Sequence, residues 1–239
     1  SLLFCLDADT LISKNYLKII VQYYQKYNFQ VSTVNFKHQE SQDPIINKGI
    51  RIYEDGLKSM ANKIEYCKSP YGYVSMGSTI VCNAISYIAV GGMPKKKATE
   101  DFYFLQSLAK YTSIFQIKEI LVFPSSRNEE RVYLGTGHRM KEYYLNNSFK
   151  SLFFPDESYE IIKKIIYFFE NQYNQPYESL NKELNKHFSN NICNFLYQHN
   201  IKNIWDKINS NAKTKNQFRT FFHQWFDGLK IIKMLKYLS

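Results

Sequence analysis

Cysteine is scarce and ungrouped in this 239-residue chain. The four cysteines, Cys5, Cys67, Cys82 and Cys193, form no Cys-x-x-Cys pair, so the usual ligand spacing of a zinc site is absent. A chain of this size can build a core without a disulfide framework. Cys5 and Cys82 also lie in apolar runs, as reduced core cysteines do. We therefore expect a reducing, cytoplasmic location.

Long hydrophobic runs are also absent. No uninterrupted apolar stretch reaches the roughly 18–20 residues that a membrane-spanning helix needs, and no signal peptide is recognisable. The chain opens with Ser1 and continues directly into residues 2–6, an apolar run typical of a buried strand. Proteins rarely begin in such a strand, so we expect that upstream sequence is missing.

Arginine is the third scarcity. The basic residues are nearly all lysines, and Asn, Ile, Tyr and Lys are abundant together, as expected for an A/T-rich genome. The net charge of +10 is therefore weak evidence for an anionic partner. The lysines are scattered and no nucleic-acid-binding module is recognisable. We expect no nucleic-acid partner, and a phosphate-bearing substrate or an anionic membrane surface accounts for the charge equally well.

Core-forming residues, by contrast, are plentiful. Hydrophobic residues make up 44% of the chain and aromatic residues 17%, which is too rich for disorder. Apolar spacing predicts helices over residues 13–27, with Ser13 as the N-cap, and 50–64, separated by a strand over 29–36 and an exposed loop over 37–47. The sequence also predicts an extended segment at 78–82, a helix at 83–90 and a helix at 100–110 that is capped by Thr99. A strand at 114–123 and a loop at 124–144 follow.

Beyond Pro155 the pattern changes. Helical periodicity dominates and no strand signal interrupts it. The helices expected there cover residues 158–173, 177–188, 192–198 and 216–238. The sequence thus predicts an α/β domain over residues 1–150 and an α-helical C-terminal region over 151–239.

Two carboxylates follow the opening strand. Asp7 and Asp9 stand at i and i+2 on a rigid base, and such a pair can bind a hard divalent cation that neutralises a diphosphate. The motif is common, so these residues are equally simple loop carboxylates when taken alone. Haloacid-dehalogenase-type phosphohydrolases also place Asp-x-Asp after a strand, but they carry a Thr four positions beyond the first Asp. Here that position is Leu11, and the threonine comes one residue early at Thr10.

A second acidic motif follows about ninety residues later. Gly91-Gly92 forms a turn signal, and Thr99-Glu100-Asp101 comes shortly after it. Taken alone, Glu100 and Asp101 are ordinary charges for a helix N-terminus. Together with Asp7-Ala8-Asp9, and with residues 77–83 as a strand, this order resembles the inverting family 2 glycosyltransferases of the GT-A fold. The resemblance covers about residues 2–140.

The resemblance implies an N-terminally truncated GT-A core and a role for each acidic residue. Asp101 would be the general base that takes the proton from the acceptor hydroxyl, kept ionised by the helix dipole. Glu100 would position the acceptor. Asp9 would ligate Mn²⁺ or Mg²⁺ directly, and Asp7 would contact the donor ribose or act through water. The metal would offset the charge of the departing nucleoside diphosphate.

A basic stretch after residue 124 completes the implied site. Related enzymes close such a segment over the diphosphate, so Arg127 and Arg131 are candidate donor-binding residues and His138 a candidate metal ligand. The alternative is a surface loop. The Gln-x-x-Arg-Trp motif of processive synthases is absent, so we expect transfer of a single sugar from a nucleotide-sugar donor to a glycan or lipid-linked acceptor, in surface glycan synthesis. A non-catalytic fragment or scaffold remains the alternative, because the base-binding strands would lie upstream.

The last predicted helix is amphipathic and basic. Lys230, Lys233 and Lys236 alternate with apolar residues. Such a helix can lie on an anionic membrane near a lipid-linked acceptor, and it can equally pack on its own domain or on a partner in a homodimer.

Overall fold

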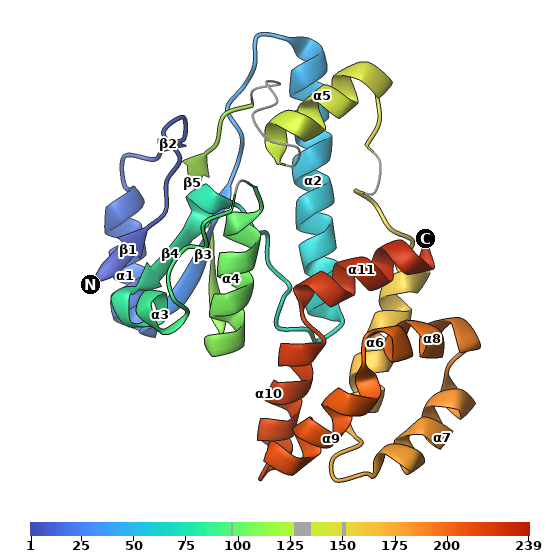
Figure 1. Ribbon diagram of the computed structural model, residues 1–239. Coiled ribbons are helices and arrows are strands. Elements are labelled where there is room, and N and C mark those ends of the chain that lie inside the picture. The colour runs from blue at the N-terminus through green and yellow to red at the C-terminus, as the bar shows by residue number, and fades with distance from the viewer. Residues whose placement is uncertain (97, 127–134, 150–151) are drawn as a thin grey trace. The chain divides into compact units, whose positions relative to one another are not determined.

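The computed structural model describes residues 1–96, 98–126, 135–149 and 152–239, and these residues form two compact units (Figure 1). Unit 1 comprises Ser1–Glu65 and Pro70–Phe153. Unit 2 comprises Phe154–Ser239 together with the short segment Tyr66–Ser69. Unit 1 is mixed α/β and unit 2 is helical where described, as the sequence predicts at this level.

A mixed five-stranded sheet forms the centre of unit 1. Its order is β1-β4-β3-β5-β2, with β3 and β5 parallel and the other neighbours antiparallel. Its long strands, β3 and β5, confirm the strands expected over residues 29–36 and 114–123. The strand bounds are Leu2–Phe4 (β1), Leu11–Ile12 (β2), Val31–Phe36 (β3), Ile80–Asn83 (β4) and Ile114–Phe123 (β5).

An irregularity interrupts the pairing of β3 with β5. Val34 pairs with Ile117 but Asn35 pairs with Ile120, so β5 carries extra residues at this point. Asn35 fills the gap, because its Nδ2 donates to the carbonyl of Lys118 at 2.9 Å. A bulge of this kind bends a strand, and the Asn35 amide gives the Lys118 carbonyl a partner at the irregularity.

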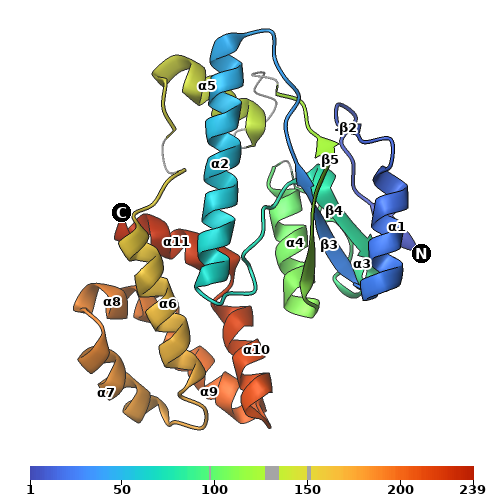
Figure 2. The same ribbon diagram turned by 180° about the vertical axis from the view of Figure 1, so that it is seen from behind.

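Helices cover both faces of the sheet. Figures 1 and 2 show the sheet between α1 on one side and α4 on the other. Tyr16 and Ile20 of α1 pack with Val34, Phe36 and other strand residues in one apolar cluster. The helices of unit 1 are α1 (Tyr16–Tyr27), α2 (Pro44–Tyr66), α3 (Ala84–Ala89), α4 (Glu100–Tyr111) and α5 (Thr136–Asn146), with a 3₁₀ turn η1 at Gly77–Thr79.

Helix ends differ from the predictions in three places. Helix α1 begins at Tyr16, whose N–H donates to the carbonyl of Ser13, so Ser13 is not the N-cap. Thr99 precedes α4 with φ 63°, and its hydroxyl donates to the carbonyl of Ala98 and does not cap the helix. Asn83, by contrast, caps α3 by accepting from Ser86 N at 2.7 Å.

Two expected loops contain helix. Helix α2 begins at Pro44, which suits a first helical turn because proline needs no hydrogen-bond acceptor. Helix α5 occupies residues expected to be a loop, and it is anchored because Met140 and Tyr143 are buried. Glycines of α2 make room for this packing. A Cβ on Gly49 would lie 2.5 Å from the Tyr143 ring, and one on Gly56 2.6 Å from Leu152.

Unit 2 packs its helices around aromatic side chains. Trp205, Phe169, Phe218 and Phe222 are all fully buried, and the indole of Trp205 donates to the carbonyl of Gln175 at 2.8 Å. The predicted last helix is two helices, and one helix was not foreseen, at Ile201–Asn211. The helices are α6 (Asp156–Glu170), α7 (Tyr177–His187), α8 (Asn190–Gln198), α9 (Ile201–Asn211), α10 (Lys215–Trp225) and α11 (Gly228–Leu238).

Helix α11 uses its apolar stripe for packing. Ile231, Met234 and Leu235 are fully buried, and α11 packs against α6. Contact of this helix with a membrane stays a prediction, although these three apolar side chains are already covered by protein. Within the described ranges, no helix is both long enough and apolar enough to cross a membrane.

Candidate functional site

Ser78 ties the first acidic motif to the sheet. Ser78 is fully buried in η1, and its hydroxyl donates to Asp7 Oδ2 at 2.6 Å while accepting from Asp7 N at 3.2 Å. Thr10 Oγ1 lies 2.8 Å from the same Ser78 oxygen. A serine has one proton to donate, so Thr10 is the donor in this last bond. The turn after β1 is therefore held in place although Asp7 itself is exposed.

Gly77 lies between the two acidic motifs. A Cβ placed on it would be 3.7 Å from Asp101 Cβ and 3.8 Å from both carboxylate oxygens of Asp7. Residues more than ninety positions apart in the sequence therefore face one glycine. The structure thus brings Asp7 and Asp101 together, as the resemblance implied, and Gly77 leaves open the space that a side chain would fill.

The environment of Asp101 raises the pKa of its carboxyl above the ordinary value. Burial is the main cause, and the negative charges of Glu100 and Asp7 act in the same direction. Hydrogen bonds from the N–H groups of Phe102, at 2.7 Å, and of Gly77 oppose it. The N–H of Phe102, in the first turn of α4, therefore favours the carboxylate, but burial outweighs it, so the net shift runs against the predicted effect of the helix dipole.

Helix α4 presents Glu100 and Asp101 in its first turn. The Gly-Gly turn precedes it, with both glycines in the left-handed region at φ 79° and 76°. A Cβ on Gly92 would meet the Tyr87 ring at 2.9 Å, and that ring packs edge-on against Phe104 of α4. The glycines thus let α3 and α4 pack closely, and this packing fixes the start of α4.

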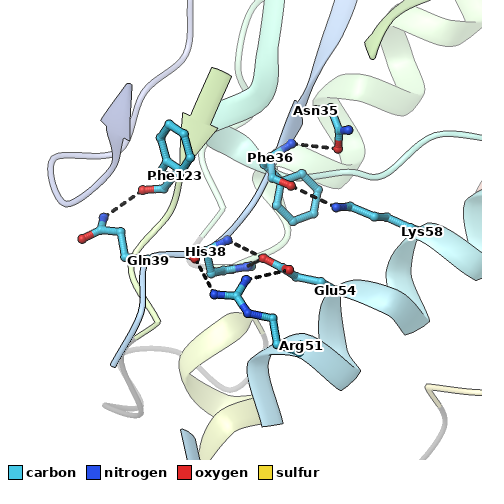
Figure 3. Close-up of polar contacts among 8 residues, drawn as sticks. All are labelled: Asn35, Phe36, His38, Gln39, Arg51, Glu54, Lys58 and Phe123. Carbon is cyan, nitrogen blue, oxygen red and sulfur yellow. Dashed lines mark hydrogen bonds and ion pairs between the residues drawn. The ribbon is translucent and has the colours of Figure 1, made fainter. Parts of the chain in front are cut away.

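Asp9 is held through its backbone. Gln39 Nε2 donates to the carbonyl of Asp9 at 3.0 Å and to the carbonyl of Phe123 at 2.8 Å, the second bond being drawn in Figure 3. Gln39 follows β3 and Phe123 ends β5, so the Asp7–Asp9 turn is fastened to the ends of two strands. Nothing in the sequence had pointed to Gln39.

A buried tyrosine links α2 to α5 near Asp101. Burial raises the pKa of Tyr53, a hydrogen bond with Thr136 and the charge of Arg139 lower it, and the charge of Asp101 raises it. Tyr53 is thus within electrostatic reach of both an arginine and the candidate base. The sequence placed Thr136 and Arg139 in a basic loop, and the structure places them in the first turn of α5.

Figure 3 shows a polar cluster between the end of β3 and α2, formed by the buried His38 and Glu54 and the partly exposed Arg51. His38 donates its backbone N–H to Glu54, and its Nδ1 lies 2.8 Å from Glu54 Oε1. Arg51 donates to Glu54 Oε2 at 2.9 Å and to the carbonyl of His38 at 3.0 Å. Burial raises the pKa of Glu54, but these bonds and charges outweigh it, so the net shift is downward. The cluster joins β3 to α2.

Asp7 and Asp9 supply carboxylate oxygens, which are the ligands that Mg²⁺ and Mn²⁺ take. Mg²⁺ and similar ions are often held by one or two carboxylates plus substrate phosphates, so a protein cage of three ligands is not required. Among the described residues, no three His, Cys, Asp or Glu side chains gather as a metal-binding group, and His138 therefore does not join Asp7 and Asp9 in one. Arg127 and Arg131 lie outside the described residues.

The chain was compared with protein-family models, curated proteins and solved structures. No protein-family model, no curated protein and no solved structure matches the chain.

Proposed function

We propose that this chain belongs to an inverting glycosyltransferase with a GT-A-type core, which moves a single sugar from a nucleotide-diphosphate donor to an acceptor hydroxyl. The observation that carries the proposal is the placement of Asp7 and Asp101 around Gly77. One carboxylate stands on the exposed turn after β1, where a metal-bound diphosphate could be held. The other stands half-buried at the start of a helix, where a base is needed.

We assign a separate role in the reaction to each acidic residue of the site. Asp101 accepts the proton of the acceptor hydroxyl as that oxygen attacks the anomeric carbon, and Glu100 orients the acceptor. Asp7 and Asp9 hold Mn²⁺ or Mg²⁺, which supplies charge compensation for the diphosphate when bound. Ser78 and Gln39 hold the Asp7–Asp9 turn in position. We place this reaction in the cytoplasm, in the synthesis of a surface glycan.

The test is sugar transfer or donor hydrolysis measured with a panel of nucleotide sugars and Mn²⁺. We expect Asp101→Asn to reduce turnover by about 10²–10⁴-fold, the usual contribution of a general base. Asp55→Asn is the matched control, because Asp55 is an exposed aspartate on α2. An Asp101→Asn variant with wild-type turnover would contradict the assignment of the base.

Metal binding gives a second test that does not need turnover. Mn²⁺ broadens the backbone NMR signals of nearby residues, so titration of the chain should affect the Asp7–Asp9 turn first. We expect Asp9→Ala to abolish this effect. Broadening elsewhere, or broadening that survives in the variant, would remove the metal from the proposal and favour the scaffold alternative.

A further inference from the structure

Thr99, the residue before α4, has an unusual backbone conformation. Its φ is 63° and its ψ is 17°, which lies in the left-handed region. Most side chains avoid this region because their Cβ comes too close to the following carbonyl oxygen. A β-branched residue is a genuine outlier there. Such a conformation persists only where the surrounding structure holds it, and strained residues of this kind cluster at functional sites.

Other residues of the chain adopt positive φ with less strain. Apart from Thr99, the described non-glycine residues that do so are four asparagines and one lysine, namely Asn28, Asn147, Asn174, Asn200 and Lys68. Asparagine visits the left-handed region readily because its short polar side chain can hydrogen-bond locally. Asn200 even precedes a helix, α9, in the same way as Thr99 precedes α4. Within the described ranges, Thr99 is thus the one β-branched residue in this region.

The hydroxyl of Thr99 is turned away from the helix that it precedes. Thr99 Oγ1 donates to the carbonyl of Ala98 at 2.6 Å. An ordinary N-cap threonine has an extended backbone, and its oxygen accepts from the N–H of the second or third helical residue. In α4 these residues are Asp101 and Phe102, and the side chain of Thr99 caps neither of them.

Thr214 shows the ordinary arrangement in the same chain. It precedes α10 with φ −139°, and its hydroxyl accepts from the N–H of Gln217, the third residue of that helix, at 3.2 Å. Two threonines therefore precede helices in two different ways. The difference between them is the partner of the third N–H of the helix.

At α4 the third N–H binds the candidate base. Phe102 N donates to Asp101 Oδ1 at 2.7 Å. The N–H of Gly77 donates to the same carboxylate. Backbone groups of two elements, α4 and η1, therefore fix the Asp101 side chain. The first of these bonds is available because Thr99 does not cap the helix.

We propose that Thr99 is a positioning residue for Asp101. Its left-handed backbone sets the direction of the first turn of α4, and its bond to Ala98 keeps the hydroxyl away from Phe102 N, so that this N–H holds the carboxylate beside Gly77. The inference rests on the proposed function for the role of Asp101 as the base. The position of the carboxylate can be measured without donor or turnover.

Two substitutions of Thr99 test the backbone conformation. Glycine enters the left-handed region without a steric penalty, so Thr99→Gly should keep Asp101 in place. Proline has φ near −65° and cannot enter this region, so Thr99→Pro should redirect the first turn of α4 and displace the carboxylate. Prolines already precede α6 and α7 in this chain, with φ −56° and −59°, so a helix can start after proline here.

The first readout is the amide NMR signals of Phe102 and Gly77. An N–H that donates to a carboxylate resonates downfield, so both signals should move upfield in Asp101→Asn, which removes the charged acceptor. We expect Thr99→Pro to move both signals upfield to a similar extent. Thr99→Gly should leave both signals close to their wild-type positions, which is the rescue that a positioning role requires.

The second readout is turnover with the best donor. Thr99→Pro should lower kcat by on the order of 10²-fold, which is the effect of misplacing a reacting group by about 1 Å. The KM for the donor should change little, because the Asp7–Asp9 turn that would hold the diphosphate is a different segment. Thr99→Gly should have a kcat close to that of the wild type.

Ser189→Pro is the matched control for the proline substitution. Ser189 precedes α8 with φ −65° and makes no side-chain cap bond, so proline fits there without a change of backbone. This control should alter neither readout. If Thr99→Pro does not fold, Thr99→Val replaces it, because valine keeps the branched Cβ but lacks the hydroxyl that bonds Ala98. The valine variant should then move both amide signals upfield, whereas the glycine variant should not.

Two results would overturn the inference. One is a folded Thr99→Pro variant with wild-type amide signals and kcat. The other is a Thr99→Gly variant whose amide signals match those of Asp101→Asn, because the side chain and not the backbone of Thr99 would then hold the base. Failure of the transferase proposal gives a different pattern, in which the wild type turns over no donor while Thr99→Pro still moves the signals of Phe102 and Gly77.

Discussion

At the scale of single residues, Ser78 fixes the position of Asp7 in the first acidic motif. Its hydroxyl bonds both the backbone and the carboxylate of Asp7. We predict that Ser78→Ala weakens Mn²⁺ binding by about 10–100-fold, the usual effect of removing a residue that orients a metal ligand. NMR line broadening by Mn²⁺ measures this change.

The control for Ser78→Ala is Ser86→Ala. Ser86 is also fully buried in unit 1, and its hydroxyl has no partner within the described residues. Its removal should leave Mn²⁺ affinity unchanged. Equal effects from the two variants would mean that Ser78 supports the fold and not the turn.

The pH–rate profile should have an acidic limb that reports the ionisation of Asp101. Burial raises its pKa, and a base acts only when deprotonated, so kcat/KM should fall as pH drops through this raised pKa. The limb should therefore lie above the roughly 3.9 of an unperturbed aspartate. A pH–rate profile with the best donor measures it, and a limb at or below that value would contradict the assigned environment.

The sequence anticipated the acidic residues of this site but not the groups that hold them. Asp7 and Asp101 were found because spacing and strand or helix context follow a family pattern. Ser78 and Gln39 were not, since their roles come from hydrogen bonds across 71 and 30 positions. No local pattern marks such contacts.

At the scale of elements, the cluster of His38, Glu54 and Arg51 joins β3 to α2. We predict that Glu54→Gln lowers the free energy of unfolding at neutral pH by about 2 kcal/mol, somewhat less than a fully buried pair loses, because Arg51 is partly exposed. Urea unfolding measures the change. Glu119→Gln, at an exposed site on β5, is the matched control.

The same variant carries a pH signature. The pKa of Glu54 is lower in the folded state, so its contribution is fully present above the roughly 4.3 of an unfolded glutamate and is lost as pH falls through the lowered value. The stability gap between wild type and Glu54→Gln should therefore shrink as the solution is acidified through this range. A gap that widens on acidification would contradict the direction of the shift.

Elements with a clear period were predicted, and those without one were not. Strand β5 matches its predicted bounds because β-branched and aromatic residues begin it, end it and predominate along it. Helix α5 was missed because Gly135 and Gly137 indicate a loop, whereas burial of Met140 and Tyr143 stabilises a helix. The break between α10 and α11 was missed because the apolar stripe continues across it, while Asp227 starts a new helix by capping Lys230 N.

At the scale of the whole molecule, the reactivity of the four cysteines measures the unfolding of both units. All are free, and burial raises the pKa of Cys5, Cys67 and Cys82 to about 11 and that of Cys193 above its ordinary value. Protonated thiols react slowly. We predict that the native chain resists thiol reagents at mildly alkaline pH and that all four thiols react in guanidinium chloride, as read by mass spectrometry of labelled peptides.

The order of labelling with rising denaturant tests the division into units. Cys5 directly follows β1, and its N–H donates to the carbonyl of Ile80 in β4, the strand that contains Cys82, so the two thiols should become reactive together. Cys67 belongs to unit 2, where its thiol donates to the carbonyl of Tyr159 at 3.2 Å, so it should share its midpoint with Cys193. A Cys67 midpoint that follows Cys5 and differs from Cys193 would contradict this assignment.

The segment Tyr66–Ser69 has a consequence for how the protein is made. These four residues are synthesised early, yet their unit is otherwise built from residue 154 onward. Cys67 can form its hydrogen bond only after Tyr159 has been synthesised. Tyr66 can likewise contact Lys163, whose ammonium lies 3.7 Å from the centroid of the Tyr66 ring, only after Lys163 has been synthesised. Domains generally fold as they leave the ribosome. Here Tyr66–Ser69 leave the ribosome with unit 1, but the residues of unit 2 that they contact are synthesised more than eighty residues later.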